Sequence, residues 1–121
     1  MLVPVPREAN YHALPQWGVD AVLLREALRE GGQVVIMRFV KNGSQYIARP
    51  IEGFDQILNA LAGVLVNTTL ILDGGRRASF IARVGTYHGA RVIYLPKKLN
   101  RIVEEYWRED RQVIATISVL E

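Results

Sequence analysis

Hydrophobic residues alternate with polar ones along several short stretches of this chain, which predicts β-strands bounded by turns. The first pair of strands flanks Asn42-Gly43, the preferred residue pair for a two-residue type I′ hairpin turn. In that register Phe39 pairs with Tyr46, and Arg38 pairs with Ile47. One face of the hairpin then carries Val35, Met37, Phe39, Tyr46 and Ala48. The other carries Ile36, Arg38, Val40, Ile47 and Arg49, so both faces are apolar and one adds two arginines.

A second group of strands follows the same alternation. Residues 68–72 and 77–86 predict two strands joined by the turn Asp73-Gly74-Gly75-Arg76, and His88-Gly89 turns the chain into residues 91–95. In this register Arg83 pairs with Tyr94 and Val84 pairs with Ile93. The expected core face carries Phe80, Ala82, Val84, Ile93 and Leu95. The opposite face carries Arg77, Ile81, Arg83, Tyr87 and Tyr94. Residues 113–120 predict a last strand.

Helical spacing predicts three helices. One runs about ten residues from Asp20 to Gly31-Gly32, where glycine is a common helix end. Apolar residues three and four apart predict a second between Phe54 and Leu65, and Pro96 starts a third. Three prolines within residues 1–18 predict an extended N-terminal arm. The chain is therefore expected to form one α+β domain over residues 19–121, with an antiparallel sheet of five or six strands and helices mainly on one face.

Basic residues are concentrated in the middle of the chain. Between Gly32 and Arg101 there are ten basic and three acidic residues, whereas the flanks have five basic and nine acidic ones. The middle is thus +7 and the flanks are −4, within a total of +3. A basic surface attracts polyanions, of which nucleic acid is the commonest. The alternative is an ordinary surface whose acids are distant in sequence but near in space.

Composition gives little support to catalysis. The chain has no cysteine and two histidines, and it contains neither a P-loop nor a Gly-x-Ser-x-Gly elbow. Gly74-Gly75 could cradle a phosphate, although a tight hairpin explains these glycines better. We therefore expect no enzyme, no metal and no cofactor. No apolar run reaches the roughly 20 residues of a membrane span. A cytoplasmic location is expected, and the lack of cysteine is compatible with a thermophile.

The aromatic and basic residues of the predicted sheet suggest how nucleic acid would bind. Bases stack on aromatic rings while arginines contact phosphates. We expect Tyr87 and Tyr94 to stack bases, with Phe39 or Tyr46 as a second platform if the first hairpin turns that side outward. The arginines expected to contact phosphates are Arg38, Arg49, Arg77 and Arg83.

One segment resembles a known family of regulators. Residues 90–103 give a short strand, Leu95-Pro96-Lys97 and a helix, and a closing strand follows at 113–119. This order is similar to AbrB-like transcription factors, whose swapped-hairpin barrels bind duplex DNA through basic residues. The chain departs from them in its longer helix and in having residues 108–111 in place of a Gly-Asp turn. The resemblance implies duplex contacts by Arg91, Lys97, Lys98 and Arg101.

The overall layout resembles the ThermoDBP-like proteins of archaea. It shares with them a proline-rich arm, helices beside an antiparallel sheet, no cysteine and an aromatic, basic surface. The resemblance implies single-stranded DNA as the ligand and a homodimer as the assembly. The favoured hypothesis is sequence-tolerant binding of single-stranded DNA, and the duplex-binding regulator is the alternative. A homo-oligomeric structural or protein-interaction module is a third possibility, because both faces of the first hairpin are apolar.

Overall fold

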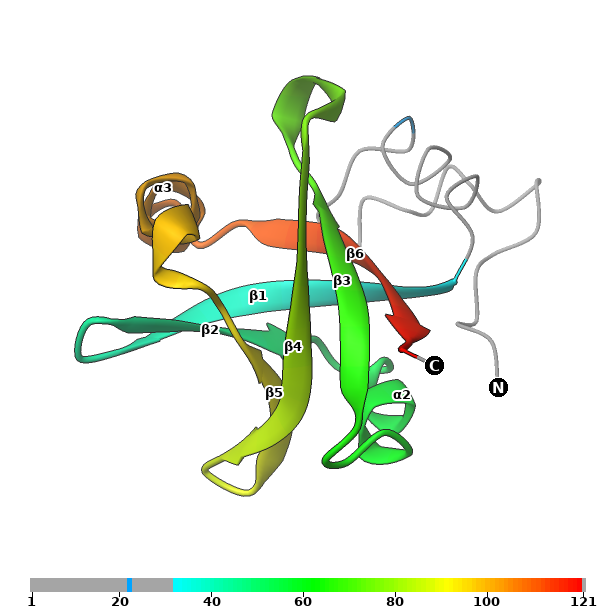
Figure 1. Cartoon of the computed structure of the whole chain (residues 1–121). Coiled ribbons are helices and arrows are strands. Elements are labelled where there is room, and N and C mark those ends of the chain that lie inside the picture. The colour runs from blue at the N-terminus through cyan, green and yellow to red at the C-terminus, as the bar shows by residue number, and fades with distance from the viewer. Residues whose placement is uncertain (1–21, 23–31, 121) are drawn as a thin grey trace.

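The computed structural model describes Val22 and residues 32–120, and six antiparallel strands in this region close into a barrel (Figure 1). The order around the barrel is β1-β2-β5-β4-β3-β6, and β6 returns to pair with β1. The strands are β1 (Gln33–Asn42), β2 (Gln45–Pro50), β3 (Leu65–Ile71), β4 (Arg77–Tyr87), β5 (Ala90–Tyr94) and β6 (Gln112–Val119). The prediction of an open α+β sheet is therefore wrong, because pairing of β6 with both β1 and β3 leaves no free edge.

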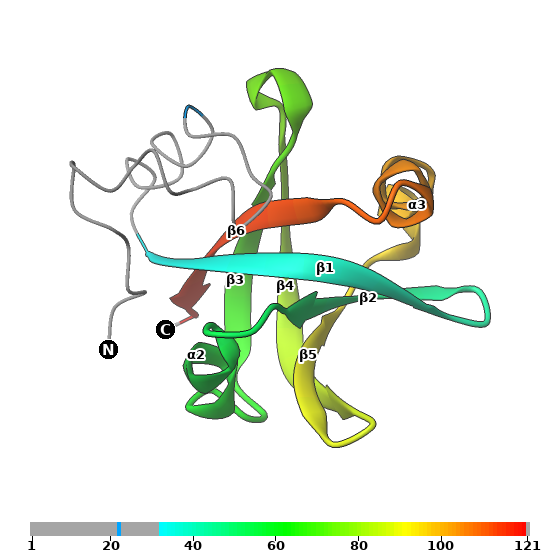
Figure 2. The same cartoon turned by 180° about the vertical axis from the view of Figure 1, so that it is seen from behind.

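The described part of the chain has two α-helices, which lie on opposite sides of the barrel (Figures 1 and 2). They are α2 (Asp55–Asn59) and α3 (Asn100–Arg108), and a 3₁₀ turn (Lys97–Leu99) precedes α3. The prediction of three helices on one sheet face is thus wrong. The arm of residues 1–18 lies outside the described residues, and so does the helix expected from Asp20 to Gly31-Gly32 apart from Val22, which is helical, and Gly32. The helix expected from Phe54 to Leu65 is short, because Gly63 adopts a φ of 76° and Leu65 already belongs to β3.

The barrel interior and both helices share one hydrophobic core. Leu58 of α2 and Phe54, the residue just before α2, enter it on one side, and Val103 and Tyr106 enter it from α3. The predicted core face of the hairpin formed by β4 and β5 is confirmed, since four of its five residues are buried and Ala82 packs against them. The buried four are Phe80, Val84, Ile93 and Leu95.

The β1–β2 hairpin and the β4–β5 hairpin differ in how well their residue pairing was predicted. Val84 pairs with Ile93 and Gly85 with Val92, as expected. In the first hairpin the loop is Gly43-Ser44, not Asn42-Gly43, so Phe39 pairs with Ala48. Gly43 has a φ of 63°, and glycine at the first loop position is typical of a type II′ turn. The register is therefore shifted by two residues, which keeps every side chain on its predicted face.

Candidate nucleic-acid interface

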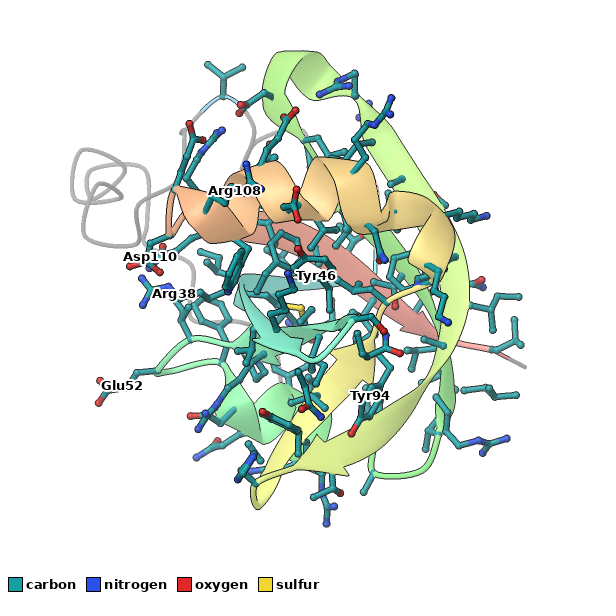
Figure 3. All side chains as sticks on the ribbon, turned by 90° about the vertical axis from the view of Figure 1, so that its left-hand side faces the viewer. Arg38, Tyr46, Glu52, Tyr94, Arg108 and Asp110 are labelled. Atoms are coloured by element: carbon teal, nitrogen blue, oxygen red, sulfur yellow. The ribbon has the colours of Figure 1, made fainter. Side chains whose placement is uncertain are left out.

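Tyr94 lies flat on the outer surface of the barrel, over Gly85 of the neighbouring strand β4. A Cβ atom added to Gly85 would come within 2.8 Å of the Tyr94 Cε2 atom. The Tyr94 hydroxyl donates a hydrogen bond of 2.8 Å to the Thr86 carbonyl oxygen, which fixes the other end of the ring. The residue is still 39% exposed. Its ring is thus held against the sheet while its outer side faces solvent (Figure 3).

Arginines stand on both sides of this ring. On β2, Ile47 pairs with Tyr94, and Arg49 is the next residue along β2 on the same outer face. On β4, Val84 pairs with Ile93 of β5. Arg83 comes just before Val84 and Tyr94 just after Ile93, so Arg83 lies across from Tyr94. The Arg83 Nη1 atom donates a hydrogen bond of 2.6 Å to the Gly63 carbonyl oxygen, and the side chain remains exposed. Neither Arg49 nor Arg83 forms an ion pair with another described residue.

Tyr87 extends this surface toward the β4–β5 turn. It is two residues beyond Gly85 on the same face of β4, and it is half-buried beside the His88 ring, with a centroid distance of 4.2 Å. We call the outward-facing group Arg49, Arg83, Tyr87 and Tyr94 the Tyr94 surface. The rings and cations predicted for it therefore do share a solvent-open face, with the exceptions given next.

Two predicted arginines are placed differently. Arg77 is exposed, but it is six residues from Arg83 along β4, a distance of about 20 Å in a strand. Its Nη1 atom donates to the Gly75 carbonyl oxygen in the β3–β4 turn. Arg38 pairs directly with Arg49 across β1 and β2, so it borders the Tyr94 surface. Unlike Arg49, Arg38 contacts a carboxylate, with 3.4 Å between its Nε atom and Asp110 Oδ1 (Figure 3).

The predicted second platform is not available for stacking. Phe39 and Tyr46 are 4% and 3% exposed, because their side of the hairpin faces the core. Phe39 packs edge-on against Tyr106 of α3, and the Tyr46 hydroxyl donates a hydrogen bond of 3.0 Å to Glu104. The outer apolar side chains of the hairpin are also covered, since Ile36 and Ile47 are both fully buried. The two apolar faces of this hairpin suggested an oligomer interface, but these side chains are buried within the chain itself.

The ion pairs of the acidic residues involve only some of the basic side chains. Four of the seven acids in residues 32–120 form ion pairs, and their described partners are Arg38, Arg108 and Arg111. These pairs gather around the α3–β6 connection. Within the described residues, eight basic side chains have no ion pair, namely Lys41, Arg49, Arg76, Arg83, Arg91, Lys97, Lys98 and Arg101. The Tyr94 surface is therefore positive, and no acidic residue within the described part of the chain forms an ion pair with its arginines.

The four residues of the duplex-binding alternative are divided between β5 and the segment that runs from Lys97 into α3. Arg91 is half-buried at the β4–β5 turn, where it donates a hydrogen bond of 2.5 Å to the Thr86 hydroxyl. Lys97 and Lys98 are exposed in the 3₁₀ turn that precedes α3, and Arg101 is exposed in the first turn of α3. The strand, helix and strand of the AbrB-like segment are all present, but β5 and β6 are not neighbours in the barrel.

Two features of the surface were missed from the sequence. Gly85 is what allows Tyr94 to lie flat, and the predicted register already placed these residues on adjacent strands. Trp107 is 38% exposed, and the Lys41 ammonium lies 5.0 Å from its ring centroid. Its exposure could have been inferred, because Trp107 follows Tyr106 and so lies off the buried side of α3.

Comparison with known proteins adds no family assignment: no protein family, no curated protein and no solved structure matches the chain. Within residues 32–120 and Val22, no three His, Cys, Asp or Glu side chains are grouped so as to hold a metal ion. Among the same residues, no helix has the length and apolar character needed to cross a bilayer.

Proposed function

We propose that this protein binds single-stranded nucleic acid, with DNA favoured, in a sequence-tolerant manner through the Tyr94 surface. One observation supports this most strongly. A tyrosine ring is fixed flat on the barrel with one side open, between two arginines that have no carboxylate partner in the described structure. Every base has a π-face, so stacking on Tyr94 does not depend on sequence.

The arginines provide the complementary part of the binding. A guanidinium group pairs well with phosphate oxygens and can also stack on a base. Arg49 and Arg83 lie on different strands on either side of the ring, so they can contact phosphates that flank one stacked base. One chain presents the whole surface, and the proposal therefore needs no second copy.

The experiment is a comparison of two ligands of equal length. A labelled thymine homo-oligomer and a mixed-sequence duplex are titrated with the protein at low and at physiological salt, and binding is followed by fluorescence anisotropy. We expect the single strand to bind more tightly at both salt concentrations. Its affinity should fall with salt, with a log–log slope of about −0.7 for each phosphate contacted. Tighter, sequence-dependent binding of the duplex would instead favour contacts by Arg91, Lys97, Lys98 and Arg101.

A further inference from the structure

A cavity of about 590 Å³ lies next to the Tyr94 surface, on the outer side of β1, β2 and the start of β6. Arg38 and Arg49 line it together with Gln112, and Val40, Pro50 and Ile51 add apolar walls. Small-molecule pockets measure about 300–1,000 Å³, so the space is sufficient for a ligand of nucleotide size.

The two arginines of this cavity repel each other. Arg38 and Arg49 are direct cross-strand partners, and like charges in this position are unfavourable. Asp110 lies 3.4 Å from Arg38, whereas Arg49 has no ion pair among the described residues. One positive charge thus remains uncompensated, and a phosphate bound between the guanidinium groups would relieve the repulsion.

Gln112 lines the cavity and carries an unused hydrogen-bond acceptor, which a rotation of its side chain would turn toward a ligand. Gln112 is the β6 partner of Arg38, so it lies on the other side of Arg38 from Arg49. Its Oε1 atom is buried and has no hydrogen-bond donor in the described structure. Buried acceptors are normally satisfied, so a donor from a ligand would complete this site. The amino and imino groups of nucleobases supply such N–H donors.

The remaining walls suit the flat face of a base. Pro50 and Ile51 provide apolar contact near the end of β2, and Val40, which pairs with Ile47, provides it on the other side of the Arg38–Arg49 pair. Glu52, which also lines the cavity, points away from the barrel (Figure 3), and it forms no ion pair with either arginine. The cavity therefore combines sites for a phosphate, for a ring and for a base N–H group.

We infer that this cavity binds one nucleotide of the bound strand, with its phosphate between Arg38 and Arg49 and a base N–H group donating to Gln112 Oε1. The inference rests on the proposed function. Arg49 belongs to both sites. It lies two residues beyond Ile47 on β2, and Ile47 pairs with Tyr94 of β5. A strand stacked on Tyr94 thus passes Arg49 before it reaches the cavity.

The first test uses a single nucleotide with the full chain. Thymidine 5′-monophosphate, thymidine and inorganic phosphate are each titrated into ¹⁵N-labelled protein. We expect the mononucleotide to shift the amide signals of Arg38, Arg49 and Gln112 in a saturable way. Because it uses both halves of the site, it should bind at least about tenfold more tightly than thymidine or phosphate alone. Equal affinity of phosphate and mononucleotide would overturn the assignment of the base to Gln112.

The second test changes the acceptor without changing its size. Gln112→Glu places a carboxylate beside the two arginines, where it competes with the phosphate, so mononucleotide affinity should fall by about tenfold or more. Gln56→Glu, an exposed position on α2, makes the same charge change away from the cavity and should leave that affinity unchanged. Equal losses in the two variants would contradict a specific site, and thermal unfolding of both checks that the fold is intact.

The outcomes separate this inference from the proposed function. If the thymine homo-oligomer binds in a Tyr94-dependent way but the mononucleotide shifts no cavity signal, the cavity assignment is wrong and strand binding stands. If the mononucleotide binds the cavity and the oligomer binds no more tightly than it does, the cavity is a nucleotide site and the strand-binding proposal is wrong. If neither binds at low salt, both are wrong.

Discussion

Two regions of this barrel combine tyrosine with arginine, and they use the combination differently. At the α3–β6 connection, Tyr106 is 4% exposed and the Arg111 guanidinium carbon lies 4.3 Å from its ring centroid. Arg111 also binds Asp73 at 2.6 Å and Glu109 at 3.4 Å. At the Tyr94 surface the ring is 39% exposed, and its arginines have no described carboxylate partner. Residue type is thus shared, while burial and neighbouring acids distinguish a structural contact from a proposed binding surface.

The Tyr106 region joins parts of the chain that are distant in sequence. The Asp73 backbone N–H donates a hydrogen bond of 2.9 Å to the Tyr106 hydroxyl, which attaches the β3–β4 turn to α3. The hydrogen bond from Arg111 lowers the pKa of the Asp73 carboxyl below its usual value of 3.8, and the same bond raises the pKa of Arg111. Burial raises the pKa of Tyr106. These groups therefore stay in the charge states that hold the connection together at neutral pH.

Tyr106→Ala should have the largest effect, and it should act on stability. Removing a buried aromatic ring from a core costs about 3–5 kcal/mol, and this ring also contacts Phe39 and Arg111. Denaturant unfolding measures the change in the free energy of unfolding. Tyr106→Phe keeps the ring and should lose only about 1 kcal/mol for the hydrogen bond with Asp73. A loss below about 1 kcal/mol for Tyr106→Ala would place this ring outside the structural role described.

Tyr94→Ala should act on binding instead. Loss of a stacking platform should weaken the binding of a thymine homo-oligomer by about 1–3 kcal/mol, while the free energy of unfolding changes less. Fluorescence anisotropy and denaturant unfolding measure the two quantities. The matched control is Trp107→Ala, which removes an equally exposed aromatic residue from α3 and should leave binding unchanged. If the two variants lose affinity equally, the Tyr94 surface has no special role.

Gly85→Ala sharpens this prediction by moving the ring without changing its chemistry. The added Cβ atom would come within 2.8 Å of the Tyr94 ring, so the ring must tilt away from the sheet. Affinity should fall, and Gly85→Ala should add little loss in a protein that already carries Tyr94→Ala. Full additivity of the two losses would show that Gly85 acts on binding by another route.

Arg49→Ala and Arg83→Ala should each make binding less sensitive to salt. Each arginine that contacts a phosphate adds about 0.7 to the slope of log affinity against log salt for single strands, so each variant should lose about that amount. The control is Arg108→Ala, because Arg108 is ion-paired with Glu104 on α3. An equal change of slope for Arg108→Ala would indicate a general charge effect on the whole protein.

Asp73→Asn should have the smallest effect, limited to stability. Because the pKa of Asp73 is lower in the folded chain than its usual 3.8, the ion pair stabilises the fold above that pH and is lost as pH falls through the folded value. The Asp73 side chain is 53% exposed, so the expected loss at neutral pH is only about 0.2–1 kcal/mol. Thermal unfolding measured down to acidic pH should therefore show a shallower acid loss for the variant. An unchanged acid profile would mean that the Arg111 bond does not stabilise this connection.

Much of the β4–β5 hairpin could be predicted from the sequence, because its two faces differ in polarity. The alternation of Phe80, Ala82 and Val84 with Ile81 and Arg83 fixes which side is buried, and the register follows. The first hairpin lacks this contrast. With apolar residues on both sides, nothing in the pattern shows that Phe39 faces the core, and either of two adjacent turns preserves the same faces.

Closure of the barrel could not be read from local patterns. It depends on pairings between residues far apart in the chain, such as Val35 with Ala115 and Val66 with Val119. Short-range periodicity predicts the strands but not their partners. For the same reason, the sequence indicated the aromatic and basic residues of the Tyr94 surface, whereas the cavity at Gln112 depends on β6 lying beside β1.

The most direct measurement is a map of the bound strand on the barrel. Backbone amide signals of the ¹⁵N-labelled chain are followed as a thymine homo-oligomer is added. The account predicts that the largest shifts fall on Tyr94, Gly85, Arg49 and Arg83, with little change around Tyr106 and Arg111. Shifts concentrated on α3, or none at the Tyr94 surface at saturating oligomer, would contradict it.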